Sequence, residues 1–393
     1  MLSHMYPSAV NWTAGIFVHE QVRALVALGH DVRVVSPKGW APPLLPRWKS
    51  FHDVPGVDTF DGVPVLYPRK LTLPGARLGH RNSDAMRWAI ATPLRRIHRA
   101  WPFDVIHAHM LVPDGWAAAS LGAELGVPVV ATAHRADVLD VPAQGPRSGA
   151  RVSEAVERID QICAVSISIG DAAAALGRPR RPVRIVPNGA DTTVFLPRPA
   201  ADARAHLGLP AQGPIVTFVG KLVPRKGVDT LIEAVGILGR RPGGAPLLVA
   251  AGIGEMRAGL EARAAELGVA DRVRFVGKIA HDDVGWWMSA GDLFVLPSLS
   301  EGLPTVVCEA MNCARPVVAT AVDGTPEIVR DGETGILIPT GDPQALADAL
   351  TRILDDAPLA ARMGEAALRI GQAEYTWAAN ARRMSSIYDE LVA

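Results

Sequence analysis

The chain has 393 residues, of which 49% are hydrophobic and 20% are charged, and 40 Lys and Arg residues balance 40 Asp and Glu residues. This composition is typical of a globular protein, and a net charge of zero excludes a generally basic nucleic-acid-binding protein. At roughly 150 residues per domain, the length favours two domains.

The apolar runs, the N-terminal segment and the cysteines bear on three further classes: membrane-spanning, secreted and disulfide-rich or zinc-binding proteins. No apolar run reaches the roughly 18 residues of a membrane-spanning helix, and the start MLSHMYPSAV lacks the order of a signal peptide. Three cysteines (Cys163, Cys308 and Cys313) are too few to indicate a disulfide scaffold or a zinc module. We therefore expect a soluble, cytoplasmic protein.

Short runs of β-branched residues alternate with helical stretches through residues 1–190. The first strand has to fit within Met1–Met5, so we expect either a very short strand or a natural start upstream of Met1. A helix is predicted over Val18–Leu28, where apolar residues recur at helical spacing. The further predicted strands are Asp31–Ser36, Val63–Tyr67, Asp104–His107, Pro128–Thr132, Gln161–Val165 and Val183–Val186.

The same alternation continues through the second half of the chain. Its strand candidates are continuous apolar runs, which indicate burial on both faces and hence parallel sheets covered by helices. We therefore predict an α/β protein with two doubly wound, Rossmann-like domains. The strands are Pro214–Val219, Leu247–Ala250, Arg272–Val276, Asp292–Leu296, Pro316–Thr320 and Gly335–Ile338, and the helices include Asp229–Leu238, Glu255–Leu267, Asp282–Ala290 and Thr305–Cys313.

The boundary between the domains is expected near residues 187–199 (PNGADTTVFLPRP), where Asn-Gly and three prolines break both periodicities. We predict a first domain over residues 1–190 and a second over residues 191–372. A closing helical segment over residues 373–393 extends beyond what the second sheet needs.

The segment SLSEGLPTVVCE (Ser298–Glu309) follows a predicted strand, at the edge where open α/β sheets bind ligands. There, Glu301 would stand in the crevice, and the Thr305 and Val306 amides would form an anion site at a helix start. Glu309 could accept hydrogen bonds from two neighbouring hydroxyls, so the segment fits a sugar nucleotide. Taken alone, two glutamates at this spacing are more simply a helix cap and a solvated side chain.

The loop VGKLVPRKG also follows a predicted strand and holds Lys221, Arg225 and Lys226 between glycines. Such cations would neutralise a departing diphosphate. An exposed basic loop explains the pattern equally well. The nearby Gly252–Gly254 is consistent with either a tight turn or close approach of a ligand.

In the first half, Gly15 precedes a helix and would let the backbone approach a ligand, while His107, His109 and His134 stand at strand ends. Histidines there are more often structural, although Asp137 is near enough in sequence to orient His134. The chain has no H-E-x-x-H, no C-x-x-C pair and no acidic cluster, so we expect no metal. It also lacks a Walker loop, a nucleophile elbow and a dinucleotide fingerprint.

The segment Arg77–Trp101 holds six arginines and two tryptophans. Basic residues interleaved with Trp could lie on the inner face of a membrane as a peripheral contact. They could equally face an acidic acceptor. A solvated helix face is the simplest explanation.

Nine ordered blocks give nearly the whole chain a close resemblance to the family-4 glycosyltransferases, which are retaining enzymes of GT-B architecture. The resemblance extends to transferases of polysaccharide or teichuronic acid assembly and of natural products. It implies two Rossmann-like domains facing a central cleft, with the closing helix crossing back to the first domain. The blocks are YPSAVNWTAGIFVHEQVRALVALGHDVRVVSP, DVIHAHMLVPDGWAA, GVPVVATAHRAD, RIVPNGADTTVF, FVGKLVPRKGVDTLIEA, RVRFVGKI, LPSLSEGLPTVVCEAM, PVVATAVDGTPEIVRDGETGILI and the closing helical stretch.

The resemblance also implies roles for matched residues, with a lysine where arginine is usual at position 221 and an alanine where glycine is usual at position 314. Lys221 and Lys226 would hold the diphosphate, Glu301 the hexose and Glu309 the ribose hydroxyls. The implied catalytic residues are His134, Lys226 and Glu301, and the implied donor-binding residues are Gly15, Lys221, Lys226, Lys278, Ile279, Glu301, Gly302, Leu303, Thr305, Val306 and Glu309.

The implied activity is transfer of a hexose from a nucleotide-diphosphate sugar, expected to be a UDP-sugar with GDP as the alternative, to a hydroxyl of a glycan, a lipid-linked or a small natural-product acceptor. No residue stands out as a nucleophile, so we expect departure and attack on the same face of the sugar, without metal or cofactor. Acceptor contacts are expected from residues 38–78. Two alternatives stay open: a nucleotide-sugar epimerase of the UDP-GlcNAc 2-epimerase type, and a non-catalytic sugar-nucleotide-binding protein.

Overall fold

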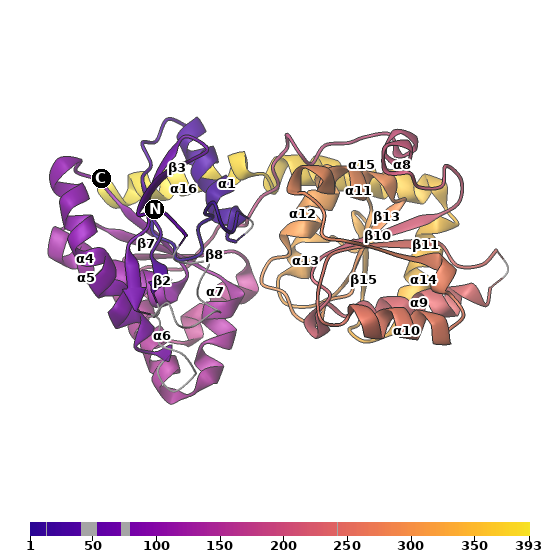
Figure 1. Cartoon of the computed structure of the whole chain (residues 1–393), viewed down its shortest axis with the longest axis horizontal. Helices are drawn as coiled ribbons and strands as arrows, with labels where there is room; N and C mark the ends of the chain where they lie inside the picture. The colour runs from indigo at the N-terminus through magenta and orange to yellow at the C-terminus, as the bar shows by residue number, and fades with distance from the viewer. Residues whose placement is uncertain (13, 41–52, 72–78, 242) are drawn as a thin grey trace. The chain divides into compact units, whose positions relative to one another are not determined.

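The computed structural model describes residues 1–12, 14–40, 53–71, 79–241 and 243–393. The chain forms two compact units, one of Met1–Pro187 with Asn380–Ala393 and one of Asn188–Ala379 (Figure 1). It therefore passes from one unit to the other twice. The first crossing lies in the Pro-rich segment at residues 187–199, and the second lies within the closing segment at residues 373–393.

The sheet of the first unit is assembled around Leu2. This residue makes parallel bridges to Val35 on one side and Ala108 on the other, so a single residue takes the place of the expected first strand. The bridges join two groups of strands into the order β3-β4-β1-Leu2-β6-β7-β8-β9. The strands are β1 Val34–Val35, β3 Val57–Phe60, β4 Val63–Leu66, β6 Ile106–His109, β7 Val129–Ala133, β8 Gln161–Ala164 and β9 Arg184–Ile185.

Three strands of this unit differ from the sequence prediction. Strand β3 runs antiparallel to β4 and alternates exposed with half-buried residues, so it lacks the continuous apolar run that marks a buried parallel strand. Strands β2 (Lys38–Trp40) and β5 (Arg69–Leu71) form a separate parallel pair, and half of their residues are Lys or Arg. Their sequences therefore carry no strand signal.

Helices pack onto the sheet of the first unit through apolar stripes. Helix α1 buries Val18, Val22 and Leu25, which recur at helical spacing. The closing helix α16 packs Met384, Ile387 and other residues into the same core as Leu25, as predicted for a helix that returns to the first domain. The helices are α1 Ile16–Ala27, α4 Asn82–Ala100, α5 Trp116–Leu125, α6 Pro146–Arg158, α7 Ile167–Ala175 and α16 Trp377–Val392.

The second unit holds one six-stranded parallel sheet in the order β12-β11-β10-β13-β14-β15, with helices on both faces (Figure 1). The strands are β10 Ile215–Val219, β11 Leu247–Ala251, β12 Val273–Gly277, β13 Leu293–Leu296, β14 Val317–Thr320 and β15 Gly335–Ile338. The helices are α8 Ala200–Leu207, α9 Val228–Gly239, α10 Arg257–Glu266, α11 Val284–Ala290, α12 Thr305–Asn312, α13 Thr325–Ile328, α14 Pro343–Leu354 and α15 Ala357–Glu374. This arrangement confirms the predicted doubly wound α/β fold.

The strand order of the second sheet positions the candidate site. Going along the chain, the sheet grows from β10 to β12 on one side and then from β13 to β15 on the other. Strands β10 and β13 are neighbours at this change of direction, and ligands of doubly wound sheets bind beyond the carboxyl ends of such a pair.

Candidate active site

The loops that follow β10 and β13 are joined at the change of direction. The amide of Leu299 donates to the carbonyl of Arg225 over 2.8 Å, which fixes one loop against the other. Gly227 makes this approach possible, since it has φ +60° and an added Cβ atom would stand 2.1 Å from the carbonyl oxygen of Pro297. Only glycine fits here without displacing backbone.

Two predicted catalytic residues meet at this point. The Lys226 ammonium donates to Glu301 Oε1 over 2.5 Å, and the Ser298 hydroxyl donates to the same oxygen over 2.6 Å. Arg225 approaches Glu301 Oε2 at 3.4 Å. The side chains of Glu301 and Lys226 are only 8% and 14% exposed, so the pair is shielded from most of the solvent. The structure thus gathers two of the three cations of the loop, Arg225 and Lys226, around one carboxylate.

Asp323 is a site residue that sequence analysis missed. It stands in the loop after β14 with φ +43°, an unusual backbone conformation for a residue other than glycine. Its carboxylate accepts hydrogen bonds from the Ser300 hydroxyl and from the Glu301 amide, both over 2.7 Å. Asp323 therefore fixes the backbone from which Glu301 extends. The Asp-Gly turn after a buried strand was the available signal.

Helix α12 begins directly after this loop, with Pro304 at its N-cap. The first amides of a helix have no acceptor within it, so those of Thr305 and Val306 are oriented as an anion site requires. Glu309 lies one turn further on the same half-buried face. Gly302 and Leu303 form the preceding turn. Their part in donor binding stays a prediction.

Lys221 and Lys278 follow β10 and β12 at the same edge of the sheet, and both are exposed, with Ile279 half-buried beside Lys278. Glycines let the strand-end loops stack closely. An added Cβ atom on Gly252 would stand 1.7 Å from the carbonyl oxygen of Gly220, and one on Gly254 would stand 2.1 Å from that of Leu222. Both glycines thus serve loop packing beside Lys221.

In the first unit, Gly15 stands at the N-cap of α1 with φ +63°, and an added Cβ atom would lie 2.2 Å from the carbonyl oxygen of Met5. His134 follows β7, and its ring contacts Phe17 of α1 at a centroid distance of 4.9 Å. Burial lowers the pKa of His134 to about 4, so the ring is neutral at pH 7.

Asp137 holds the backbone near His134 rather than its ring. The carboxylate accepts the amide of His134 over 2.8 Å and that of Leu111 over 2.5 Å, and burial raises its pKa to about 7. The His134 ring instead lies with Nε2 3.3 Å from Nδ1 of His109. Asp137 thus contacts His134 as expected, but through the backbone amide and not through the ring.

A second cluster of cations lines a pocket of about 210 Å³ in the first unit, which includes Lys70, Arg151, His4 and His80. Lys70 is only 9% exposed, burial lowers its pKa, and no hydrogen bond to its ammonium is seen among the described residues. Arg151 is held over the Trp116 ring at 4.2 Å. Arg151 also pairs with Asp84 at 3.2 Å, while the buried Asp114 contacts the His4 ring and acts electrostatically on Lys70, so carboxylates neutralise part of the cluster. Of the predicted acceptor segment at residues 38–78, residues 41–52 and 72–78 lie outside the described residues.

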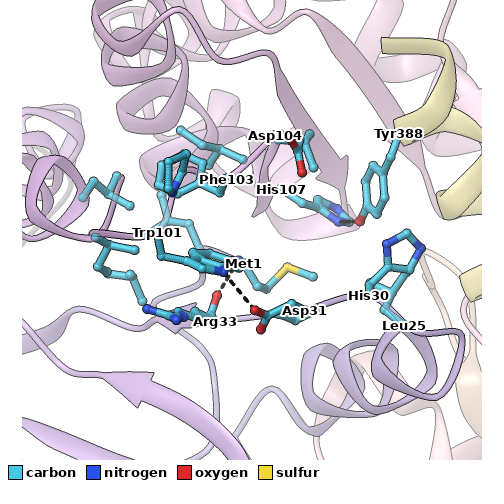
Figure 2. A pocket seen from close by; sticks show the side chains of 18 residues that line it. Met1, Leu25, His30, Asp31, Arg33, Trp101, Phe103, Asp104, His107 and Tyr388 are labelled. Carbon is cyan, nitrogen blue, oxygen red and sulfur yellow. Dashed lines mark hydrogen bonds between the residues drawn. The ribbon is translucent and has the colours of Figure 1, made fainter. Parts of the chain in front are cut away.

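A larger cavity of about 250 Å³ lies elsewhere in the first unit, around the residues that precede β1 and β6 (Figure 2). This is the amino-terminal edge of the parallel strands, opposite to the edge that binds ligands in such folds. Its wall is closed by Trp101, which donates to Asp31 over 2.8 Å and stacks under Arg33 at 4.3 Å. The cavity is therefore not part of the candidate active site.

Helix α4 takes up most of the arginine-rich segment, of which Arg77 and Leu78 lie outside the described residues. Arg87 and Arg95 both donate to Glu124 of α5, which neutralises part of the predicted basic face. Trp88 is 74% exposed. Within the described residues, none of the helices combines the length and apolar character that crossing a bilayer requires.

All three cysteines are buried as free thiols. Among the residues that the structure describes, no three His, Cys, Asp or Glu side chains are grouped as a metal site would need.

Comparisons with known proteins place the chain in a family. Residues 14–194 match the model for Glycosyltransferase Family 4, and residues 200–369 match that for Glycosyl transferases group 1. The chain is 33% identical to a D-inositol 3-phosphate glycosyltransferase of Thermobispora bispora, over 95% of this chain and 89% of that protein. It is 30% identical to the putative teichuronic acid biosynthesis glycosyltransferase TuaC of Bacillus subtilis, over 89% and 87%.

Solved structures share the fold. A sucrose-phosphate synthase of Thermosynechococcus elongatus superposes with a TM-score of 0.76 at 28% identity, over 96% of this chain and 94% of that one. The HepE protein of Anabaena, solved in complex with UDP, superposes with a TM-score of 0.75 at 22% identity, over 99% of both chains. This chain is a glycosyltransferase of family 4 with the GT-B fold.

Proposed function

We propose that the protein transfers a hexose from a nucleotide-diphosphate sugar to a hydroxyl of an acceptor that carries an anionic group, with retention of the anomeric configuration. The observation that carries the proposal is the Lys226–Glu301 pair at the change of strand direction, next to the start of α12. At this place a diphosphate would find positive charge and the amides of a helix start, and a sugar would find a carboxylate that accepts from its hydroxyls.

The donor would take over contacts that the pair now makes internally. Lys226 would turn from Glu301 to the diphosphate, with Lys221 and the Thr305 and Val306 amides as further partners. Glu301 would then be released to accept hydrogen bonds from hexose hydroxyls. The carboxylate of Glu309 would bind the ribose, and the backbone at Lys278 and Ile279 would face the base. UDP is the proposed nucleotide, in keeping with the UDP complex of the similarly folded HepE.

The reaction would proceed on one face of the sugar. The bond from the anomeric carbon to the diphosphate oxygen breaks with both electrons leaving on the diphosphate, while the acceptor oxygen forms its bond from the same side. The acceptor proton passes to the departing diphosphate oxygen, so no protein base is needed. Lys226 and the helix start would stabilise the departing charge without a metal, while Gly15 and His134 hold the sugar.

The acceptor is proposed to be a phosphorylated polyol. Lys70 is buried, no hydrogen bond from its ammonium is seen among the described residues, and it lines a pocket with Arg151, so a bound phosphate would offset the cost of burying the ammonium. Asp114 and Asp84 balance part of this positive charge in the absence of a ligand. The T. bispora relative is named a D-inositol 3-phosphate glycosyltransferase, and an inositol phosphate is a phosphorylated polyol of this kind.

Thermal-shift measurements with UDP-, GDP- and ADP-sugars test the donor first, since binding to the native state raises the melting temperature. Transfer is then assayed with inositol phosphate and with unphosphorylated inositol, and NMR of the product gives the anomer. Product from the phosphorylated acceptor alone, lost in Lys70→Met, supports the proposal. Equal use of both acceptors contradicts the anion site, and an inverted product contradicts the mechanism.

The two alternatives are separated by the same preparation. An epimerase would convert UDP-GlcNAc to its epimer without any acceptor. A non-catalytic binding protein would show thermal shifts but no product with any donor and acceptor pair.

A further inference from the structure

Two histidines end neighbouring strands of the first unit and lie against each other. His109 closes β6 and His134 follows β7, which runs parallel beside it. Their rings are stacked at a centroid distance of 5.6 Å, with His109 Nδ1 3.3 Å from His134 Nε2. His109 is almost completely buried. The state of one ring therefore constrains the other.

A chain of hydrogen bonds extends from His109 to the end of the unit. His109 Nε2 lies 2.9 Å from Gln21 Oε1 on α1, and Gln21 Nε2 donates to Asn380 Oδ1 on α16 over 2.7 Å. Asn380 Nδ2 donates in turn to the carbonyl of Pro187 over 2.7 Å. Gln21 and Asn380 are each 1% exposed, so water does not compete for these bonds.

The direction of every bond in this chain follows from its last member. The Pro187 carbonyl can only accept, so Asn380 must present its NH₂ group there and its oxygen to Gln21. Gln21 must then donate to Asn380, and its own oxygen accepts from Nε2–H of His109. A neutral imidazole carries one N–H, so Nδ1 of His109 is an acceptor.

The same logic fixes His134. Since His109 Nδ1 accepts, His134 must supply Nε2–H, and its Nδ1 is left with a bare lone pair. Burial lowers the pKa of His109 well below its usual value and that of His134 to about 4, so both rings are neutral at pH 7. Protonation of His109 at Nδ1 would place two donors face to face across the 3.3 Å contact, whereas protonation of His134 would fill the lone pair on its Nδ1.

We infer that Gln21 and Asn380 are positioning residues that hold His134 as its Nε2–H tautomer, so that its Nδ1 accepts a hydrogen bond from a hydroxyl of the transferred sugar. The role of the sugar rests on the proposed function. A hydroxyl that donates to Nδ1 has a more electron-rich oxygen, which favours a reaction centre that gains positive charge as the glycosidic bond breaks.

Nitrogen-15 NMR of histidine-labelled protein tests the tautomer directly, because the shifts of Nδ1 and Nε2 differ between protonated and bare nitrogens. The signals are assigned with His109→Gln and His134→Gln. In the wild type at pH 7, both His109 and His134 are expected as Nε2–H tautomers. An Nδ1–H or doubly protonated His134 in the wild type overturns the inference.

Gln21→Leu removes the acceptor for His109 Nε2–H while preserving the bulk of the side chain. The direction of the hydrogen bonds is then no longer fixed, so His109 and His134 should become mixtures of tautomers. Tyr388→Phe is the matched control. Tyr388 lies on the same helix as Asn380, but its hydroxyl contacts His107 Nδ1 at 2.6 Å (Figure 2). His134 should be unchanged in this control. An unchanged His134 in Gln21→Leu, with the fold preserved, contradicts the inference.

Kinetics separate this inference from the proposed function. In Gln21→Leu, kcat for transfer should fall roughly fivefold with little change in donor KM, the effect of one neutral hydrogen bond that is weakened in the transition state. If NMR shows the Nε2–H tautomer but His134→Gln transfers sugar normally, the proposed contact of His134 with the sugar fails, and the control of its tautomer by Gln21 and Asn380 stands. If His134→Gln is inactive but wild-type His134 is not the Nε2–H tautomer, only the inference about Gln21 and Asn380 fails.

Discussion

The Lys226 ammonium and the Glu301 carboxylate form a 2.5 Å ion pair that joins the loops after two adjacent parallel strands. Both side chains are largely shielded from solvent. A pair of this kind gains little stability overall, because the loss of hydration offsets most of the attraction. Its value lies in keeping a cation and an anion poised at the place where a charged ligand would separate them.

Replacing Lys226 tests that role. Lys226→Ala should lower kcat for sugar transfer by at least about 100-fold, as expected when a group that stabilises a departing charge is lost. The fold should remain, as judged by circular dichroism, with a lower free energy of unfolding because Glu301 loses its partner. Lys221→Ala, in the exposed part of the same loop, should have a smaller effect. Normal turnover in Lys226→Ala would remove the assigned role.

Glu309 is predicted to act on donor affinity. Glu309→Ala should remove two hydrogen bonds to ribose hydroxyls at about 1.5 kcal/mol each, which raises donor KM about 100-fold. Titration of UDP by calorimetry measures the same loss in binding. Glu365→Ala, an exposed glutamate on α15, serves as the control. Equal UDP affinity in both variants would count against ribose binding by Glu309.

Gly227 offers a matched pair with Gly208, since their φ angles are +60° and +61°. Gly227→Ala should suffer both left-handed strain and a clash with Pro297, whereas Gly208→Ala meets no atom within 4 Å and suffers strain alone. Strain costs roughly 1–2 kcal/mol, so urea unfolding should show a larger loss in Gly227→Ala. Similar losses in the two variants would show that the loop tolerates displacement.

Acid should destabilise the first unit. Burial lowers the pKa of His107 to about 3, that of His134 to about 4 and that of His109 well below 6.5. The unfolded chain therefore binds more protons below about pH 6.5, and stability falls by about 1.4 kcal/mol per pH unit for each histidine. Asp137, whose pKa is raised to about 7, binds its proton more readily in the folded state and so offsets the effect of one of the three histidines. For these four side chains the net expectation is a loss of roughly 3 kcal/mol per pH unit, and the lowered pKa values of His19 and of the Met1 amino group act in the same direction.

Urea unfolding between pH 6.5 and pH 5 measures this slope, a range in which ordinary carboxylates stay ionised. His107→Gln should reduce the slope of unfolding free energy against pH by about 1.4 kcal/mol per pH unit, the contribution of one histidine. A flat profile in the wild type would mean that these rings are not held neutral.

Peripheral membrane contact through α4 stays a proposal, and Trp88 is its most direct test. If the exposed indole enters the interface, Trp88→Ala should weaken co-sedimentation with vesicles that contain phosphatidylglycerol. Trp40→Ala, another exposed tryptophan of the same unit, controls for lost apolar surface. Binding that is equal in the two variants, or absent from the wild type, contradicts the proposal.

Buried parallel strands were predictable because their signal is local. Strands β10, β11 and β13 are continuous apolar runs, and the helices between them have clear apolar stripes. Strand β3, with one exposed face, and the single-residue strand at Leu2 gave no such run. Their pairing depends on neighbours that are distant in sequence.

The candidate site divides in the same way. Lys226 and Glu301 each lie in the loop that follows a recognisable strand, so both could be placed at one sheet edge from the sequence. The Lys70 and Arg151 pocket brings together residues 81 positions apart without a motif, and the contact of Gln21 with Asn380 spans 359 positions. Neither arrangement leaves a pattern in the local sequence, so both become visible only in the three-dimensional structure.

The two connections between the units are fastened to each other. Asn380 donates to Pro187 on one side of the boundary, and on the other the Ala190 amide donates to Tyr375 over 2.9 Å while Trp377 donates to Ala190 over 3.3 Å. Gly189 lets the strands touch, as an added Cβ atom would lie 2.1 Å from Thr376. The outgoing and returning segments are therefore hydrogen-bonded to each other within each unit, on both sides of the point where the chain changes unit, so neither segment can be shortened without disturbing the other.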